Sequence, residues 1–79
     1  MNERKTIGII GGGQLGLMIA EAARPMGIRT VCLDPAPDAP AGAVCDEHIV
    51  GRFDGAAAVE ELCRRSDAVT YEFENVPGE

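Results

Sequence analysis

A run of three glycines between an apolar segment and a helical pattern constrains the fold more than any other feature of the sequence. Residues 6–10 (TIGII) are rich in β-branched side chains and predict a strand buried on both faces, as in parallel sheets. Residues 11–16 (GGGQLG) follow and fit the pattern GxGxxG at Gly11, Gly13 and Gly16. The sequence therefore predicts a strand, a tight turn and a helix in direct succession.

The three glycines of the pattern have separate expected roles. Gly11 allows the tight turn, Gly13 lets the backbone approach a ligand, and Gly16 lets the helix lie close to the strand. Unpaired N–H groups and the positive end of the helix favour a phosphate or another anion at this point. The alternative is that the glycines only make a tight turn.

The helix after the turn has an apolar stripe that we expect to be its buried side, and position 17 should then face outward. Pro25 should close the last turn and Gly27 should cap it. The stripe consists of Leu15, Met18, Ile19, Ala22 and Met26.

The remaining pattern alternates strands with helices. Strands are predicted over 29–33, ending at Asp34, over 47–50 and over 68–73, and a helix over 56–66 with Asp54 as its N-cap. Asp38 could cap a short turn over 41–44. Right-handed crossovers then give an α/β fold, a Rossmann-like parallel sheet with helices on both faces and strand order 3-2-1-4. The apolar side expected for the second helix consists of Ala56, Val59, Leu62 and Cys63.

The strand order reverses between the first and fourth strands, and ligands of such sheets bind beyond the carboxyl ends at that point. Residues 11–15 and 71–75 should meet there. Glu72 and Glu74 share a face of the last strand by alternation and could hold hydroxyl or amine groups of a ligand. They could equally be the solvated end of a strand.

Asp34 has one functional and one structural interpretation. It follows Gly16 by 18 residues, near where dinucleotide-binding folds place an acid for ribose hydroxyls, so an NAD-binding half-domain of an oxidoreductase is one hypothesis. The alternative is that Asp34 fixes the turn into Pro35. For the chain as a whole, a stand-alone regulatory domain with no enzyme attached is a further hypothesis.

Composition excludes several partners. Seven basic and 13 acidic residues give a net charge of −6, which provides no broad footprint for nucleic acid or an anionic membrane. We therefore expect neither partner. Three cysteines with no CxxC pair and a single histidine do not form a zinc motif, so we expect no metal site. The odd cysteine count, with no export signal, favours reduced thiols in a cytoplasmic protein.

Five stretches carry a resemblance to a known family. They are residues 7–16, 33–35, 38–41, 46–51 and 69–77, and the pair GQLG and YEFENV is far more specific than a glycine motif alone. The chain resembles the N-terminal domain of 5-(carboxyamino)imidazole ribonucleotide synthetases, the PurK-type ligases of the ATP-grasp superfamily. Leu17 departs from the family, which often has a basic residue there.

The resemblance implies a purine-biosynthesis ligase that joins bicarbonate to the amine of aminoimidazole ribonucleotide, using ATP and Mg. It implies a carboxyphosphate intermediate and a homodimer. Within the chain, it implies that Gln14, Leu15 and Glu72 contact the ribonucleotide and that the turn backbone at Gly13 lies beside it. No catalytic or cofactor-binding residue is implied within residues 1–79. ATP and Mg would be bound by domains absent from this chain, which is expected to be a truncated, inactive part.

Overall fold

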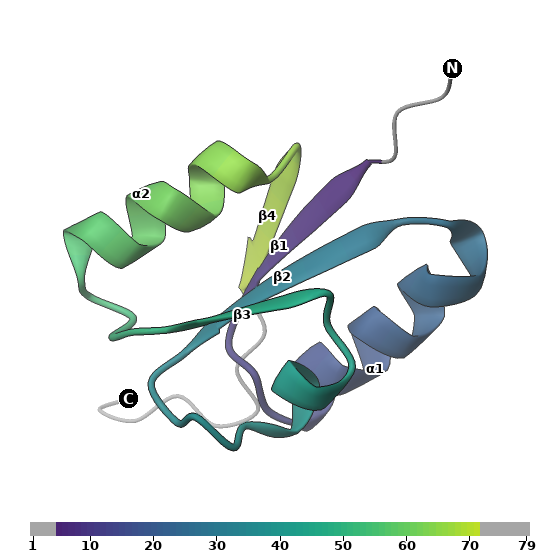
Figure 1. The fold of residues 1–79 in the computed structure, drawn as a ribbon, viewed down its shortest axis with the longest axis horizontal. Helices are drawn as coiled ribbons and strands as arrows, with labels where there is room; N and C mark the ends of the chain where they lie inside the picture. The colour runs from purple at the N-terminus through teal and green to yellow at the C-terminus, as the bar shows by residue number, and fades with distance from the viewer. Residues whose placement is uncertain (1–4, 72–79) are drawn as a thin grey trace.

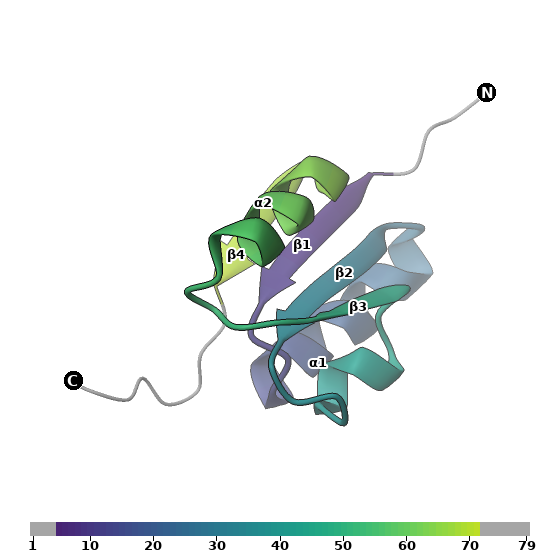
Figure 2. The ribbon, with the colours of Figure 1, turned by 60° about the vertical axis from the view of Figure 1, so that its left-hand side comes forward.

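The computed structural model describes residues 5–71, which form one parallel sheet with helices on both faces (Figures 1 and 2). The order is β3-β2-β1-β4, and all three strand pairings are parallel. This confirms the predicted fold class and strand order. The strands are β1 (Thr6–Ile10), β2 (Arg29–Asp34), β3 (Glu47–Val50) and β4 (Ala68–Tyr71). The part of the predicted fourth strand beyond Tyr71 lies outside the described residues.

Alternation along the strands divides the core into two clusters. Ile9 and Cys32 face one side, where they pack with Ala41, whereas Ile10 and Leu33 face the other. The first side is covered by α1 (Gln14–Ala23) and the 3-10 turn Pro40–Ala43, and the second by α2 (Ala56–Arg65). Both faces of β1 and β2 are therefore buried, which explains their nearly continuous apolar sequences.

Helix α1 buries a different face from the one predicted. Its buried residues are Gly16, Ala20 and Ala23, whereas Met18 is 54% exposed and Met26, beyond its end, is 71% exposed. Small side chains occupy the buried face because they let the helix axis lie close to the sheet. The predicted stripe Leu15, Met18, Ile19, Ala22 and Met26 is mostly exposed, and only Ile19 packs partly against the core.

The position of Leu17 also differs from the one predicted. It is half-buried and packs against the cluster around Ile9 and Cys32 rather than facing outward. The end of the helix is as predicted, because Pro25 lies in the 3-10 turn Arg24–Met26 and Gly27 caps it with a left-handed φ of 75°.

The two aspartates expected to cap helices do not. Gly55 is the N-cap of α2, and Asp54 instead pairs with Arg52 at 2.9 Å, which lowers the pKa of Asp54. Ala39 is the N-cap of the 3-10 turn Pro40–Ala43, one residue after Asp38. A nearby guanidinium competes successfully for the carboxylate of Asp54 because charged hydrogen bonds are the stronger ones.

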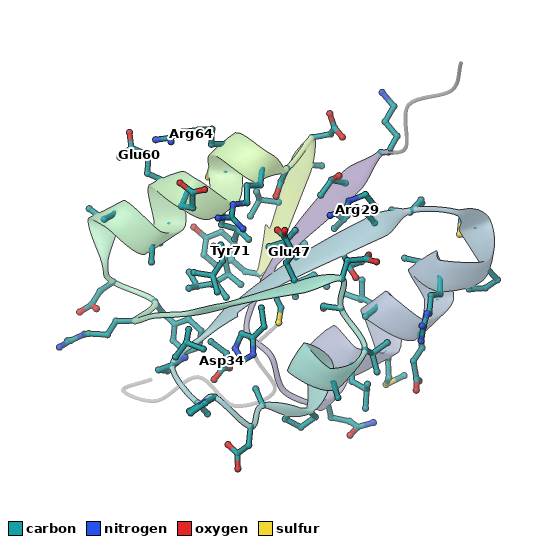
Figure 3. All side chains as sticks on the ribbon, in the orientation of Figure 1. Arg29, Asp34, Glu47, Glu60, Arg64 and Tyr71 are labelled. Carbon is teal, nitrogen blue, oxygen red and sulfur yellow. The ribbon has the colours of Figure 1, made fainter. Side chains whose placement is uncertain are left out.

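Helix α2 was predicted partly correctly. Leu62 is fully buried and Val59 packs against the same cluster, but Ala56 and Cys63 are exposed. Glu60 and Arg64 project outward from the helix (Figure 3). The helix covers β2 and β1 with a narrow apolar side, and Leu62 is its one fully buried residue.

Two other aspartates extend the sheet at strand starts. Asp67 accepts the N–H of Thr6 at 2.8 Å and donates its own N–H to the Thr6 carbonyl at 2.8 Å. Asp46 makes the same two-way contact with Thr30, at 2.8 and 2.9 Å. Each pair continues a parallel ladder by one step with a carboxylate in place of a backbone carbonyl.

Candidate functional site

The glycine turn leaves β1 by a route that only glycine follows without strain. Gly11 has a φ of 115°, and its N–H donates to the carbonyl of Leu33 at 2.9 Å. Gly13 is the N-cap of α1, and the helix begins at Gln14. Because glycine has no side chain, no side-chain hydrogen bond caps the helix. The predicted role of Gly11 is confirmed.

Gly16 brings the helix against the strand, as predicted. A Cβ atom at this position would collide with the carbonyl oxygen of Gly11 and lie 3.3 Å from Cγ2 of Ile9. Gly12 is equally confined, since its Cβ would lie 2.9 Å from that of Ala39 and 3.0 Å from that of Asp34. The close approach at Gly12 is therefore to the protein itself. The ligand approach predicted at Gly13 stays a prediction.

Asp34 holds the glycine turn. One carboxylate oxygen accepts the N–H of Gly12 at 2.8 Å, and the other accepts the N–H of Ala36 at 2.9 Å. Asp34 lies at the carboxyl end of β2, as Figure 3 shows. Its side chain thus fixes both the turn into Pro35 and the turn after β1, and sequence reasoning had anticipated only the first.

The loop after β2 reinforces this arrangement. Ala41 donates its N–H to the carbonyl of Gly12 at 2.8 Å. The carbonyl of Asp34 lies 3.3 Å from Nε2 of His48 and accepts the N–H of Gly51 at 3.3 Å. The backbone of the turn is consequently held from two sides by segments 22 or more residues away in the chain.

This arrangement argues against a pyrophosphate at Gly12. The N–H that a phosphate would use is already bonded to a carboxylate, and two like charges about 4 Å apart repel by about 4 kcal/mol near a protein surface. An anion could reach this N–H only by displacing Asp34. The turn therefore differs from the dinucleotide-binding turn that its sequence pattern resembles.

Three of the predicted substrate residues, Gly13, Gln14 and Leu15, lie at the carboxyl edge of the sheet. Gln14 and Leu15 open α1 and are exposed, and Gly13 precedes them. Tyr71, the last described residue of β4, pairs with Ile10, the last residue of β1. The ends of β1 and β4 are therefore adjacent, as predicted. Glu72 and Glu74 lie outside the described residues.

A hollow of about 380 Å³ lies beside this edge, where β2 and β3 end. It is lined by Pro35, Arg52, Phe53 and Asp54, with the Arg52–Asp54 ion pair at its rim. The sequence analysis does not predict this hollow. The only signal for it in the sequence is that its lining residues directly follow two strands. Among residues 5–71, no group of three His, Cys, Asp or Glu side chains could hold a metal ion. No helix in this range is long and apolar enough for a bilayer span.

Fold and site together define a parallel α/β domain built on a glycine-rich strand-to-helix turn. The family model of the ribonucleotide synthetase preATP-grasp domain matches residues 4–79, and the chain belongs to this family.

Relatives in sequence have consistent names. The N5-carboxyaminoimidazole ribonucleotide synthase of Staphylococcus haemolyticus is 53% identical over 74 residues, covering 94% of this chain and 20% of the relative. That of Brucella melitensis is 53% identical over 72 residues, covering 91% and 20%. The chain thus spans about a fifth of the length of these relatives.

Solved structures agree. The ADP complex of an N5-carboxyaminoimidazole ribonucleotide synthetase superposes with a TM-score of 0.88 at 50% identity, covering 96% of this chain and 20% of that chain. The synthetase from Thermotoga maritima gives a TM-score of 0.85 at 48% identity, covering 92% and 20%.

Proposed function

We propose that this chain is the N-terminal ribonucleotide-binding part of a purine-biosynthesis ligase. The ligase would carboxylate aminoimidazole ribonucleotide with bicarbonate and ATP to give 5-(carboxyamino)imidazole ribonucleotide. The observation that carries the proposal is 53% identity to the Staphylococcus haemolyticus synthase over 94% of this chain. A homodimer in the cytoplasm is part of the same proposal.

Within this chain, the proposed substrate contacts are Gly13, Gln14, Leu15 and Glu72. The adjacent ends of β1 and β4 support this grouping, since Ile10 and Tyr71 are paired immediately before the two segments. The bonds from Asp34 and Ala41 to Gly12 support a turn whose backbone is set before substrate arrives. Such preorganisation lowers the entropic cost of binding.

ATP and Mg belong, in this proposal, to other parts of the ligase. The carboxylate of Asp34 supports this assignment, because it already occupies the N–H of Gly12 that a phosphate would need. The same carboxylate disfavours the NAD-binding alternative, since Asp34 is engaged by the turn rather than presented to a ribose.

Glu72→Gln in the full-length ligase tests the proposal. The change keeps the shape and removes the charge, so one charge-assisted hydrogen bond to the ribonucleotide is weakened, at a cost of roughly 1.5–3 kcal/mol. We expect kcat/KM for aminoimidazole ribonucleotide to fall roughly ten- to a hundredfold, with little change in the KM for ATP.

Glu74→Gln and Asp34→Asn are the matched variants and should have smaller effects on ribonucleotide kinetics. Unchanged ribonucleotide kinetics in Glu72→Gln, or a larger kinetic defect in Asp34→Asn, would show that the site is wrongly placed.

A further inference from the structure

Two of the three thiols meet in one apolar cluster, on the face of the sheet that α1 covers. Cys32 is in the centre of β2 and is fully buried. Cys45 lies just before β3, is half-buried, and packs against the cluster that contains Cys32, Ile9 and Ala41. All three cysteines of the chain are free thiols, and the third, Cys63, is exposed on α2.

Hydrogen bonds on both sides hold Cys45 in place. Its own N–H donates to the carbonyl of Ala41 at 2.8 Å. The next residue, Asp46, is fastened to Thr30 in β2 by two bonds of 2.8 and 2.9 Å. The chain is thus anchored beside β2 at Asp46, opposite Thr30 and two residues before Cys32 along that strand, and Cys45 packs against the cluster that contains Cys32.

The two thiols differ in acidity because they interact. A hydrogen bond from Cys32 and one from Thr30 lower the pKa of Cys45 to about 7, against the opposing effects of burial and of the nearby Asp46 carboxylate. The same thiol–thiol bond, together with burial, raises the pKa of Cys32 far above its ordinary value. These shifts favour the thiolate at Cys45, the more accessible sulfur, and the protonated form at the buried Cys32, and the thiolate is the nucleophilic form.

We propose that Cys45 and Cys32 form an oxidation site at which a peroxide converts the two thiols into an intrachain disulfide. The Cys45 thiolate attacks one oxygen of hydrogen peroxide, the O–O bond breaks, and the departing hydroxide takes a proton to form water. Cys45 is then a sulfenic acid. The Cys32 sulfur attacks the Cys45 sulfur, the S–O bond breaks, and a second water leaves with the proton of Cys32.

The disulfide would act on the glycine turn. Cys45 follows the 3-10 turn Pro40–Ala43, and Ala41 in that turn donates to the Gly12 carbonyl and accepts from Cys45. A covalent bond from Cys45 to β2 would fix the position of this loop and hence of the backbone that supports Gly12. A dithiol reductant would reverse the change.

Peptide mapping of the full-length protein that carries this chain tests the proposal. Trypsin cuts after Arg29 and Arg52, so Cys32 and Cys45 fall in one peptide, 30–52, and Cys63 falls in another, 53–64. After hydrogen peroxide, denaturation and alkylation, we expect peptide 30–52 to lack two hydrogens and carry no alkyl group. If the sample is reduced before alkylation, peptide 30–52 should carry two alkyl groups. Cys63 is the internal control for simple exposure and should remain largely alkylatable.

The pH dependence gives a second readout. For a thiol with pKa about 7, the thiolate fraction and the oxidation rate rise about tenfold from pH 6 to pH 8, and the rate then levels off. A thiol with the ordinary pKa of about 8.5 gives nearly a hundredfold rise over the same interval.

Single variants separate the two sulfurs. In Cys32→Ala, Cys45 loses the hydrogen bond that lowers its pKa and should oxidise more slowly, but its product should stay a sulfenic acid that dimedone labels. In Cys45→Ala, Cys32 should stay reduced. Cys63→Ala should leave the disulfide unchanged. The proposal is overturned if wild-type peptide 30–52 keeps both thiols while Cys63 is oxidised, or if Cys32 oxidises equally without Cys45.

Discussion

Asp34 shows how one side chain can remove a function that a motif suggests. The spacing from Gly16 to Asp34 is that of a dinucleotide fold, but both carboxylate oxygens bond to backbone N–H groups, those of Gly12 and Ala36. The residue is therefore structural, and the glycine turn is held by an internal anion. A turn with this sequence pattern therefore need not bind a dinucleotide.

Asp34→Asn should destabilise the protein. Asparagine has one acceptor oxygen, so its amide nitrogen would face either the Gly12 or the Ala36 N–H, and we expect the free energy of unfolding to fall by about 1–3 kcal/mol. Urea unfolding of the purified protein measures this. Asp38→Asn, at an exposed position in the same loop, is the control and should change it by less than about 0.5 kcal/mol. Equal losses in the two variants would contradict the assigned role of Asp34.

Among the elements, α1 deviates most from its sequence pattern. Large apolar residues repeat at helical spacing along one face, yet the helix lies on the sheet through Gly16, Ala20 and Ala23. Contact distance decides this outcome, because the carbonyl of Gly11 leaves no room for a side chain at position 16. Leu15 and Met18 are left exposed. A hollow of about 240 Å³ is lined by Ile19 and Met26 together with Ile7 and Ile28.

The same substitution at two neighbouring positions tests this orientation. Ala20 is 1% exposed, so Ala20→Leu overpacks the helix–sheet contact and should lower the free energy of unfolding by about 1–3 kcal/mol. Ala22 is exposed beside the hollow, so Ala22→Leu should change it by less than about 0.5 kcal/mol. Thermal or urea unfolding measures both. If Ala22→Leu were the more destabilising of the two variants, the buried face of α1 would be the one that periodicity predicted.

The whole molecule is a parallel sheet covered on both faces, with a glycine turn that bonds from Asp34 and Ala41 hold. Charge neutralisation by metal ions and lysines is the main catalytic device of phosphoryl transfer. No cluster that could hold a metal forms among residues 5–71, and the chain has one lysine, Lys5, before β1.

The chain by itself should consequently show no ligase turnover. We expect phosphate release from ATP, bicarbonate and aminoimidazole ribonucleotide to equal that of a no-protein control, because the groups that position ATP are missing from the described residues. A coupled phosphate assay measures this, with a full-length ligase as the positive control. Release above the blank would mean that this stretch holds phosphoryl-transfer groups after all.

The order of elements, the bounds of β1 and β3, the strand order and the roles of Gly11 and Gly16 could all be predicted from the sequence. These features depend on neighbouring residues, on periodicity or on the handedness of connections, whereas the family was indicated by a resemblance carried by stretches such as GQLG and YEFENV. The buried face of α1, the bond from Asp34 to Gly12 and the extension of the sheet by Asp46 and Asp67 emerge only in the folded chain. Each of these depends on a close approach between segments distant in sequence, where space and competing hydrogen bonds outweigh local pattern.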